Sequence, residues 1–135
     1  MLLGCLGLVG CGGASTKRTT TGGGTGMSLT GPVAVVPGRT VRFTGTGFRP
    51  GGDVNVVLTP ADRSTCCSIT IPSSFRVTDS GAAVLEFDMP TYYRRCTALR
   101  MCKRIAWRPG EKVIVAASGY LQEARATTTV ASPSE

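Results

Sequence analysis

The sequence predicts an all-β fold, an antiparallel β-sandwich of about seven or eight strands, from three observations. From position 27 onward apolar residues alternate with polar ones, which is the period of a half-buried strand. Gly and Pro interrupt the alternation about every eight to twelve residues, where turns would join the strands. The 135 residues suit one domain of ordinary size, and 41% of them are hydrophobic, enough to form a core.

The expected strands follow this alternation along the chain. The first lies somewhere within residues 27–36, and the second contains Val41 and Phe43 and ends before the Gly- and Pro-rich turn at residues 50–52. The next strand is built on Val54, Val56 and Leu58, and Pro60 ends it because proline cannot donate to a ladder. Further candidate strands span residues 66–71, 75–78, 82–88, 112–118 and 122–130.

Four short segments carry a family resemblance. Residues 37–51, PGRTVRFTGTGFRPG, resemble the opening strand and turn of bacterial immunoglobulin-like domains of the IPT/TIG type. Segments similar to the rhythm of that family are Asp79-Ser80-Gly81, Met89-Pro90 and residues 109–113. The resemblance covers about residues 27–130 and implies an immunoglobulin-like sandwich. Such domains serve as spacers, adhesive modules or attachments to enzymes, so the resemblance implies a fold and carries over no catalytic residues.

The first eleven residues are apolar and uncharged, which is typical of an export signal. Leu8-Val9-Gly10-Cys11 resembles a bacterial lipobox, and this resemblance implies that the Cys11 thiol is acylated. Cys5 follows a shorter apolar run and is the weaker acceptor. No Lys or Arg precedes the run, a departure that an incorrectly assigned start codon would explain. The alternative is that this segment forms a buried first strand.

The domain organisation follows from these segments. We expect a signal segment over 1–11, a flexible Gly/Thr linker over 12–26, the sandwich over 27–131 and a tail over 132–135. After residue 11 no stretch approaches the about 20 apolar residues of a membrane helix. The expected location is therefore the cell envelope, at the outer membrane or cell surface, where a lipid on Cys11 attaches the protein to the membrane outside the cytoplasm.

Four cysteines lie within the predicted sandwich: Cys66, Cys67, Cys96 and Cys102. In an oxidising compartment an even number of cysteines predicts two disulfides, and three pairings are open. Successive residues of a strand point to opposite faces, so we expect Cys66 and Cys67 to reach separately toward Cys96 and Cys102. A four-thiolate zinc site is the alternative, but the spacing lacks a Cys-x-x-Cys knuckle.

The most distinctive segment is a basic, aromatic loop between Pro90 and Pro109, which has no Asp or Glu within residues 92–108. Guanidinium groups bind phosphate and carboxylate in two-point contacts, and aromatic rings stack on bases or sugars. The alternative is an ordinary solvated loop in which Ile105 and Trp107 face the core. The candidate anion- or partner-binding residues are Tyr92, Tyr93, Arg94, Arg95, Arg100, Lys103, Arg104, Trp107 and Arg108.

The sequence lacks the residues on which several classes of enzyme depend. The chain has no His, and its scattered Ser, Thr and Asp side chains have no visible activating partner, so we predict no enzyme activity, catalytic residue, metal, cofactor or small-molecule substrate. With a net charge of +7, the prediction is an envelope lipoprotein with a structural or interaction module for anionic polymers or another envelope protein. The alternatives are an inhibitor or accessory subunit that presents the basic loop to an envelope enzyme or secretion machine, and a small hydrolase.

Overall fold

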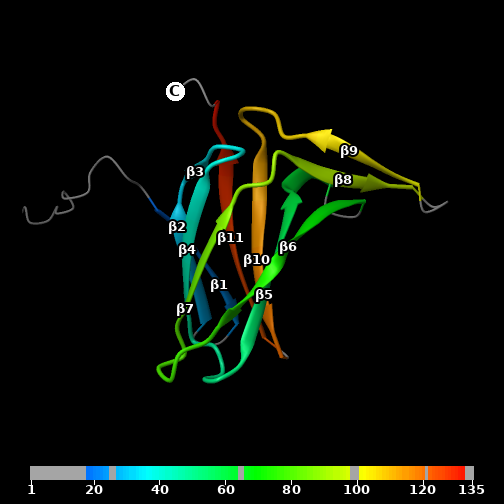
Figure 1. Ribbon diagram of the computed structural model, residues 1–135. Coiled ribbons are helices and arrows are strands. Elements are labelled where there is room, and N and C mark those ends of the chain that lie inside the picture. Colours follow the sequence, from blue (N-terminus) through cyan, green and yellow to red (C-terminus); the bar gives the residue numbers. More distant parts are fainter. Residues whose placement is uncertain (1–17, 25–26, 64–65, 98–100, 121, 133–135) are drawn as a thin grey trace, which may run out of the picture.

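The structure, a computed structural model, describes residues 18–24, 27–63, 66–97, 101–120 and 122–132 (Figure 1). The strands of these residues form two sheets that face each other. The four-stranded sheet contains, in spatial order, β1 (Arg18–Gly24), β2 (Met27–Pro32), β4 (Thr40–Thr46) and β7 (Ala83–Asp88). The seven-stranded sheet contains β3 (Ala34–Val35), β11 (Gln122–Val130), β10 (Lys112–Gly119), β5 (Asp53–Pro60), β6 (Cys67–Arg76), β8 (Tyr92–Cys96) and β9 (Cys102–Ala106).

The connections between the two sheets are those of an immunoglobulin-like sandwich. The described part of the chain passes from β1 and β2 of the four-stranded sheet to β3 of the other sheet, returns to the first sheet for β4 and β7, and otherwise lies in the seven-stranded sheet. Neighbouring strands are antiparallel except for β3, which runs parallel to β11. The predicted all-β, immunoglobulin-like class is confirmed. The described part of the chain has eleven strands, more than the seven or eight expected.

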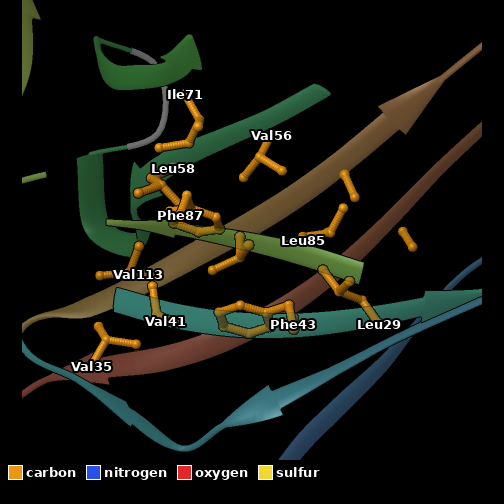
Figure 2. Close-up of a cluster of buried hydrophobic side chains, with 14 of the residues drawn as sticks. Leu29, Val35, Val41, Phe43, Val56, Leu58, Ile71, Leu85, Phe87 and Val113 are labelled. Carbon is orange, nitrogen blue, oxygen red and sulfur yellow. The ribbon is translucent and has the colours of Figure 1, made fainter. Parts of the chain in front are cut away.

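The core lies between the sheets, where alternate side chains of β4, β5, β7 and β10 meet (Figure 2). Val41 and Phe43 point inward from β4, and the Phe43 ring stacks with that of Phe87 in β7 at 6.5 Å between ring centroids. Leu85, the register partner of Phe43 in β7, has no exposed surface. The alternation that predicted the strands therefore also marks the residues that form the core.

Two glycines, one in a turn and one in a strand, make room for Phe48. Gly81, in the predicted turn before β7, has a φ of 85°, a conformation that side-chain-bearing residues rarely adopt. A Cβ at this position would also lie 2.8 Å from the carbonyl oxygen of Phe48. In β4, a Cβ on Gly45 would lie 2.4 Å from the Phe48 ring. Both glycines allow Phe48 to pack at the end of the core, where it is buried.

The sequence placed two segments incorrectly. Residues 18–24 of the predicted linker form β1, which pairs with β2 through contacts such as Thr20 with Thr30, because Thr-rich backbone can extend an open sheet edge without apolar side chains. The predicted strands 66–71 and 75–78 are largely one strand, β6, with an irregular register opposite Asn55 and Val57 of β5. The proposed signal segment, Cys11 and the rest of the linker lie outside the described residues.

The helical content of the described residues is the short 3-10 helix η1 (Ala61–Arg63), and no helix there could reach across a bilayer. The hairpin of β8 and β9 forms one end of the seven-stranded sheet and extends sideways beyond β6 (Figure 1). It joins β6 through two register pairs, Cys67 with Arg95 and Ser68 with Arg94. The predicted basic loop is thus largely a hairpin that projects from the sandwich.

Candidate functional site: the basic hairpin

The candidate site is the hairpin formed by β8 and β9, residues 92–96 and 102–106, which we call the basic hairpin. Its register brings cations together across the two strands: Arg94 lies opposite Arg104, and Arg95 lies opposite Lys103. Opposed residues of an antiparallel pair share a face, so one cation pair occupies each face of the hairpin. All four side chains are exposed. Like charges directly opposite each other destabilise a hairpin, so this register has a cost for stability.

The basic hairpin has no acidic side chain to offset these charges, since residues 92–108 contain no Asp or Glu. Ion pairs elsewhere in the described chain join Arg76 to Asp53 at 3.8 Å and Arg125 to Glu123, in other strands. Arg104 instead lies over the ring of Tyr92, with its Cζ 4.7 Å from the ring centroid. This cation–π contact orients the guanidinium group without neutralising it. The hairpin therefore presents uncompensated positive charge to solvent.

The aromatic residues of the predicted site separate into two groups. Tyr92 is half-buried on the outward face, where it contacts Arg104. Tyr93 and Trp107 are buried, at 2% and 6% exposure, and their rings pack at 4.6 Å between centroids. The prediction that Tyr93 and Trp107 bind a ligand is therefore wrong, because both rings join the base of the hairpin to the core. Strand alternation turns Tyr93 and its register partner Ile105 away from the outward face. The alternation of Ile105 and Trp107 was the signal for this placement.

Two further cations belong to the predicted site, Arg100 and Arg108, and of these Arg108 lies beyond the end of β9. Arg108 follows β9 and is exposed, and its backbone N–H donates to the Glu111 carboxylate at 3.0 Å. A small pocket beside it is lined by Asp62, Arg63 and Glu111 as well as Arg108, so carboxylates balance the cations there. Arg100 lies outside the described residues. The structure therefore places four of the six predicted cations on the basic hairpin, one pair on each face.

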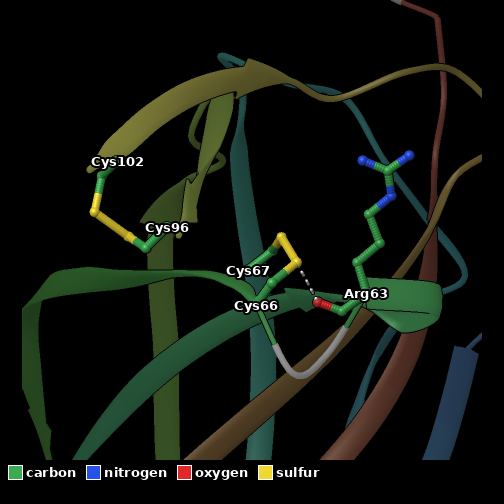
Figure 3. Close-up of a disulfide and its surroundings, with 5 residues drawn as sticks. All are labelled: Arg63, Cys66, Cys67, Cys96 and Cys102. Atoms are coloured by element: carbon green, nitrogen blue, oxygen red, sulfur yellow. Dashed lines mark hydrogen bonds between the residues drawn. A yellow bond between two sulfur atoms is a disulfide. The ribbon is translucent and has the colours of Figure 1, made fainter. Parts of the chain in front are cut away.

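The disulfide pairing differs from the expectation. Cys66 bonds to its neighbour Cys67, and Cys96 bonds to Cys102 (Figure 3). The expected bridges between the two regions are wrong, because Cys96 and Cys102 lie directly opposite each other in the register of β8 and β9. Cys66 precedes β6 in a turn, so the opposite-face rule for strand residues does not apply to both members of the first pair.

The Cys96–Cys102 disulfide closes the tip of the basic hairpin. The backbone N–H of Thr97 donates to the carbonyl of Met101 at 2.9 Å in the same region. Closing a loop of this length restricts the unfolded chain by about 2 kcal/mol in the chain-entropy model. This stabilisation offsets the repulsion between the opposed cations, so the disulfide lets the hairpin carry these charges and remain folded.

A groove of about 530 Å³ runs along the outward face where β6 meets β8. It is open to solvent and combines apolar side chains, a cation and both disulfides. Arg94 and Tyr92 contribute from β8, and Ser68 contributes from the paired position of β6. The remaining lining residues are Cys66, Ile69, Thr70, Pro72, Pro90 and Cys96.

No cluster of three or more potential metal ligands occurs within the described ranges. The sequence matches no known protein-family model, and no curated protein matches it. Among solved structures it is similar to the sulfur carrier protein SoxY from Chlorobium limicola f thiosulfatophilum, with a TM-score of 0.36 and 16% sequence identity. That similarity covers 93% of this chain and 94% of SoxY. At this level of similarity no function extends from SoxY to this chain.

Proposed function

We propose that the protein is a non-enzymatic cell-envelope lipoprotein whose immunoglobulin-like domain, of the IPT/TIG type, binds anionic polymers through the basic hairpin. The observation that supports this proposal is the register of the hairpin, which opposes Arg94 to Arg104 and Arg95 to Lys103 with no acidic partner. An arrangement that lowers stability is retained where it serves binding. The proposed ligand class is a phosphate-bearing polymer, because guanidinium groups match phosphate oxygens in two-point contacts.

The shape of the hairpin supports the same proposal. Disulfide closure and the buried Tyr93–Trp107 contact hold both ends of the hairpin, so few side chains lose freedom when a ligand binds. Cations on both faces suit a flexible chain that wraps the hairpin better than a small ligand that occupies one pocket. The lipid on Cys11 would keep this surface near other envelope polymers. The mass of the mature chain extracted from membranes tests the lipid directly.

Binding to inorganic polyphosphate tests the hairpin. The test variant replaces Arg94, Arg95, Lys103 and Arg104 with Ala. Its matched control replaces four exposed cations of the sandwich with Ala: Arg42, Arg49, Lys112 and Arg125. Both variants lower the net charge from +7 to +3, since 7 − 4 = 3, so only the place of the charge differs.

We expect the hairpin variant to lose most of its polyphosphate affinity at low salt and the control variant to keep it. Because each cation–phosphate contact releases about 0.7–0.9 counterion, the slope of log K against log salt should fall by about 3 in the hairpin variant. Equal losses in the two variants would show that net charge alone drives binding and would contradict the proposal. Polyglutamate in a parallel titration distinguishes carboxylate from phosphate polymers.

A protein partner is the second candidate function, that of an inhibitor or accessory subunit in the envelope. It is favoured by the position of β9 at the end of the seven-stranded sheet, where its outer backbone groups have no neighbouring strand in the described fold. An extended segment of a partner could add to that edge by main-chain hydrogen bonds. Stoichiometric capture that persists at high salt would favour this function, because polymer binding through cations weakens steeply with salt.

A further inference from the structure

We propose that the Cys66–Cys67 disulfide is a thiol–disulfide exchange site whose co-reactant is a dithiol. This inference goes beyond polymer binding and does not depend on it. It starts from the different settings of the two disulfides, which lie near each other at the junction of β6 and β8 (Figure 3). The backbone N–H of Cys96 donates to the carbonyl of Cys66 at 3.3 Å, which fixes this proximity.

The Cys66–Cys67 bond has little value as a staple. A disulfide restricts the unfolded chain by closing a loop, and a bond between adjacent residues closes almost none. The Cys96–Cys102 bond, in contrast, closes a hairpin across a sequence separation of six. Loop closure therefore accounts for the second disulfide and leaves the first without a structural purpose.

The backbone conformation differs between the two disulfides, and this difference affects how easily each is reduced. Successive residues of a strand point to opposite faces, so a bond between Cys66 and Cys67 keeps Cys66 out of the strand. In the structure Cys66 lies in a turn and β6 begins at Cys67. Reduction would free Cys66 to extend β6, which favours the reduced form.

Reduction of the Cys96–Cys102 disulfide would bring no such gain in strand structure. Its two residues are register partners in β8 and β9, so the ladder holds their thiols together even when the bond is broken. Thiols that the fold keeps adjacent re-form their disulfide readily. We therefore expect the Cys66–Cys67 disulfide to be the more easily reduced of the two.

Exposure selects the sulfur that is attacked. Cys67 is 3% exposed and packs in the core, whereas Cys66 is half-buried and lines the groove between β6 and β8.

The exchange proceeds in two steps. A thiolate of the dithiol attacks the Cys66 Sγ, the Cys66–Cys67 bond breaks, and the Cys67 Sγ leaves with the electron pair and takes a proton from water. The second thiol of the dithiol then attacks the dithiol sulfur of the mixed disulfide and releases Cys66. Two electrons and two protons pass to the cysteine pair, and the dithiol becomes a disulfide.

Charge around the groove favours thiolate chemistry. Arg94 lines the groove with Cys66, and Arg95 is the register partner of Cys67. Nearby cations stabilise a thiolate relative to a thiol, which helps both the attacking and the leaving sulfur. The same charge should attract a co-reactant that is itself anionic.

The first experiment measures the equilibrium. The full chain is equilibrated in buffers of varied oxidised-to-reduced dithiothreitol ratio, quenched with an alkylating agent, and analysed by mass spectrometry for each cysteine pair. We expect half-reduction of Cys66–Cys67 at a ratio at least tenfold more oxidising than that of Cys96–Cys102, equal to about 30 mV for two electrons. Equal midpoints, the reverse order, or free Cys66 and Cys67 under oxidising conditions would overturn the proposal.

The second experiment identifies the attacked sulfur. The protein is treated at low salt with 2-mercaptoethanesulfonate or 2-mercaptoethylamine while an alkylating agent caps the released thiol. We expect the mixed disulfide on Cys66 and the cap on Cys67, and a rate per thiolate on the order of tenfold higher for the anionic reagent. Arg94→Ala should reduce this preference, and Arg42→Ala, on the other sheet, should leave it unchanged. An adduct on Cys67, or no charge preference, would refute the mechanism. Neither readout involves polyphosphate, so the exchange-site proposal can fail while the polymer-binding proposal holds.

Discussion

In β7 of the sandwich, Ala83, Leu85 and Phe87 alternate with exposed residues and are buried, whereas in β9 of the basic hairpin four of five side chains are exposed. The two strands have similar length but obtain their stability from different sources. β7 is held by apolar burial between two sheets. The hairpin is held at its tip by the Cys96–Cys102 bond and at its base by two aromatic rings.

The two sources of stability leave the two regions with different freedom to carry functional side chains. A strand whose alternate side chains fill a core has few positions free to vary, because protein interiors are close-packed. A hairpin fixed at its two ends can carry an unfavourable surface between them. In this protein that surface is four opposed cations, which is why the hairpin, and not the sandwich, is the candidate site.

The largest expected effect is in the sandwich and separates the two faces of one strand. Leu85→Ala should lower the free energy of unfolding by about 2–5 kcal/mol, because a fully buried leucine leaves a cavity. Its neighbour Val84 is 44% exposed, and Val84→Ala should cost well under half of that. Chemical denaturation of both variants measures the difference. Similar costs at the two positions would mean that β7 does not face the core as described.

An intermediate effect is expected at two turns with the same backbone conformation. Gly81 and Gly110 both have positive φ, at 85° and 90°. A Cβ on Gly81 would lie 2.8 Å from the Phe48 carbonyl oxygen, while a Cβ on Gly110 would meet no atom within 4 Å. Gly110→Ala should therefore cost about 1 kcal/mol from backbone strain, and Gly81→Ala distinctly more. Thermal unfolding compares them, and an equal shift in Tm would show that the Gly81 turn relaxes without cost.

The smallest effect is in the hairpin and has the opposite sign. Arg94→Glu replaces a repulsive cross-strand pair with an attractive one opposite Arg104, so the stability should rise by about 0.2–1 kcal/mol. The same variant should bind polyphosphate more weakly. Arg42→Glu, opposite Glu86 in the sandwich, is the control and should lower stability because it creates a like-charge pair. A loss of stability in Arg94→Glu would indicate that Arg94 has a structural role.

Part of the site was readable in the sequence and part was not. The density of Arg and Lys between Pro90 and Pro109, and the even number of cysteines, needed only residue identities. The roles of Tyr92 and Tyr93 did not follow from identity, because one position along a strand reverses the face on which a side chain lies. Once residues 92–106 are known to form two strands, the same rule puts Tyr92 outside and Tyr93 inside.

The sequence by itself determined most of the core strands of the sandwich and most of its turns, since alternation and positive-φ glycines act over a few neighbouring residues. Only the tertiary structure decided that Arg18–Gly24 adds to a sheet, that Cys66 bonds to Cys67, and that the basic segment is a hairpin on the edge of β6. Each of these depends on which distant or competing groups come within reach after folding. That choice is a property of packing in three dimensions, which local patterns do not encode.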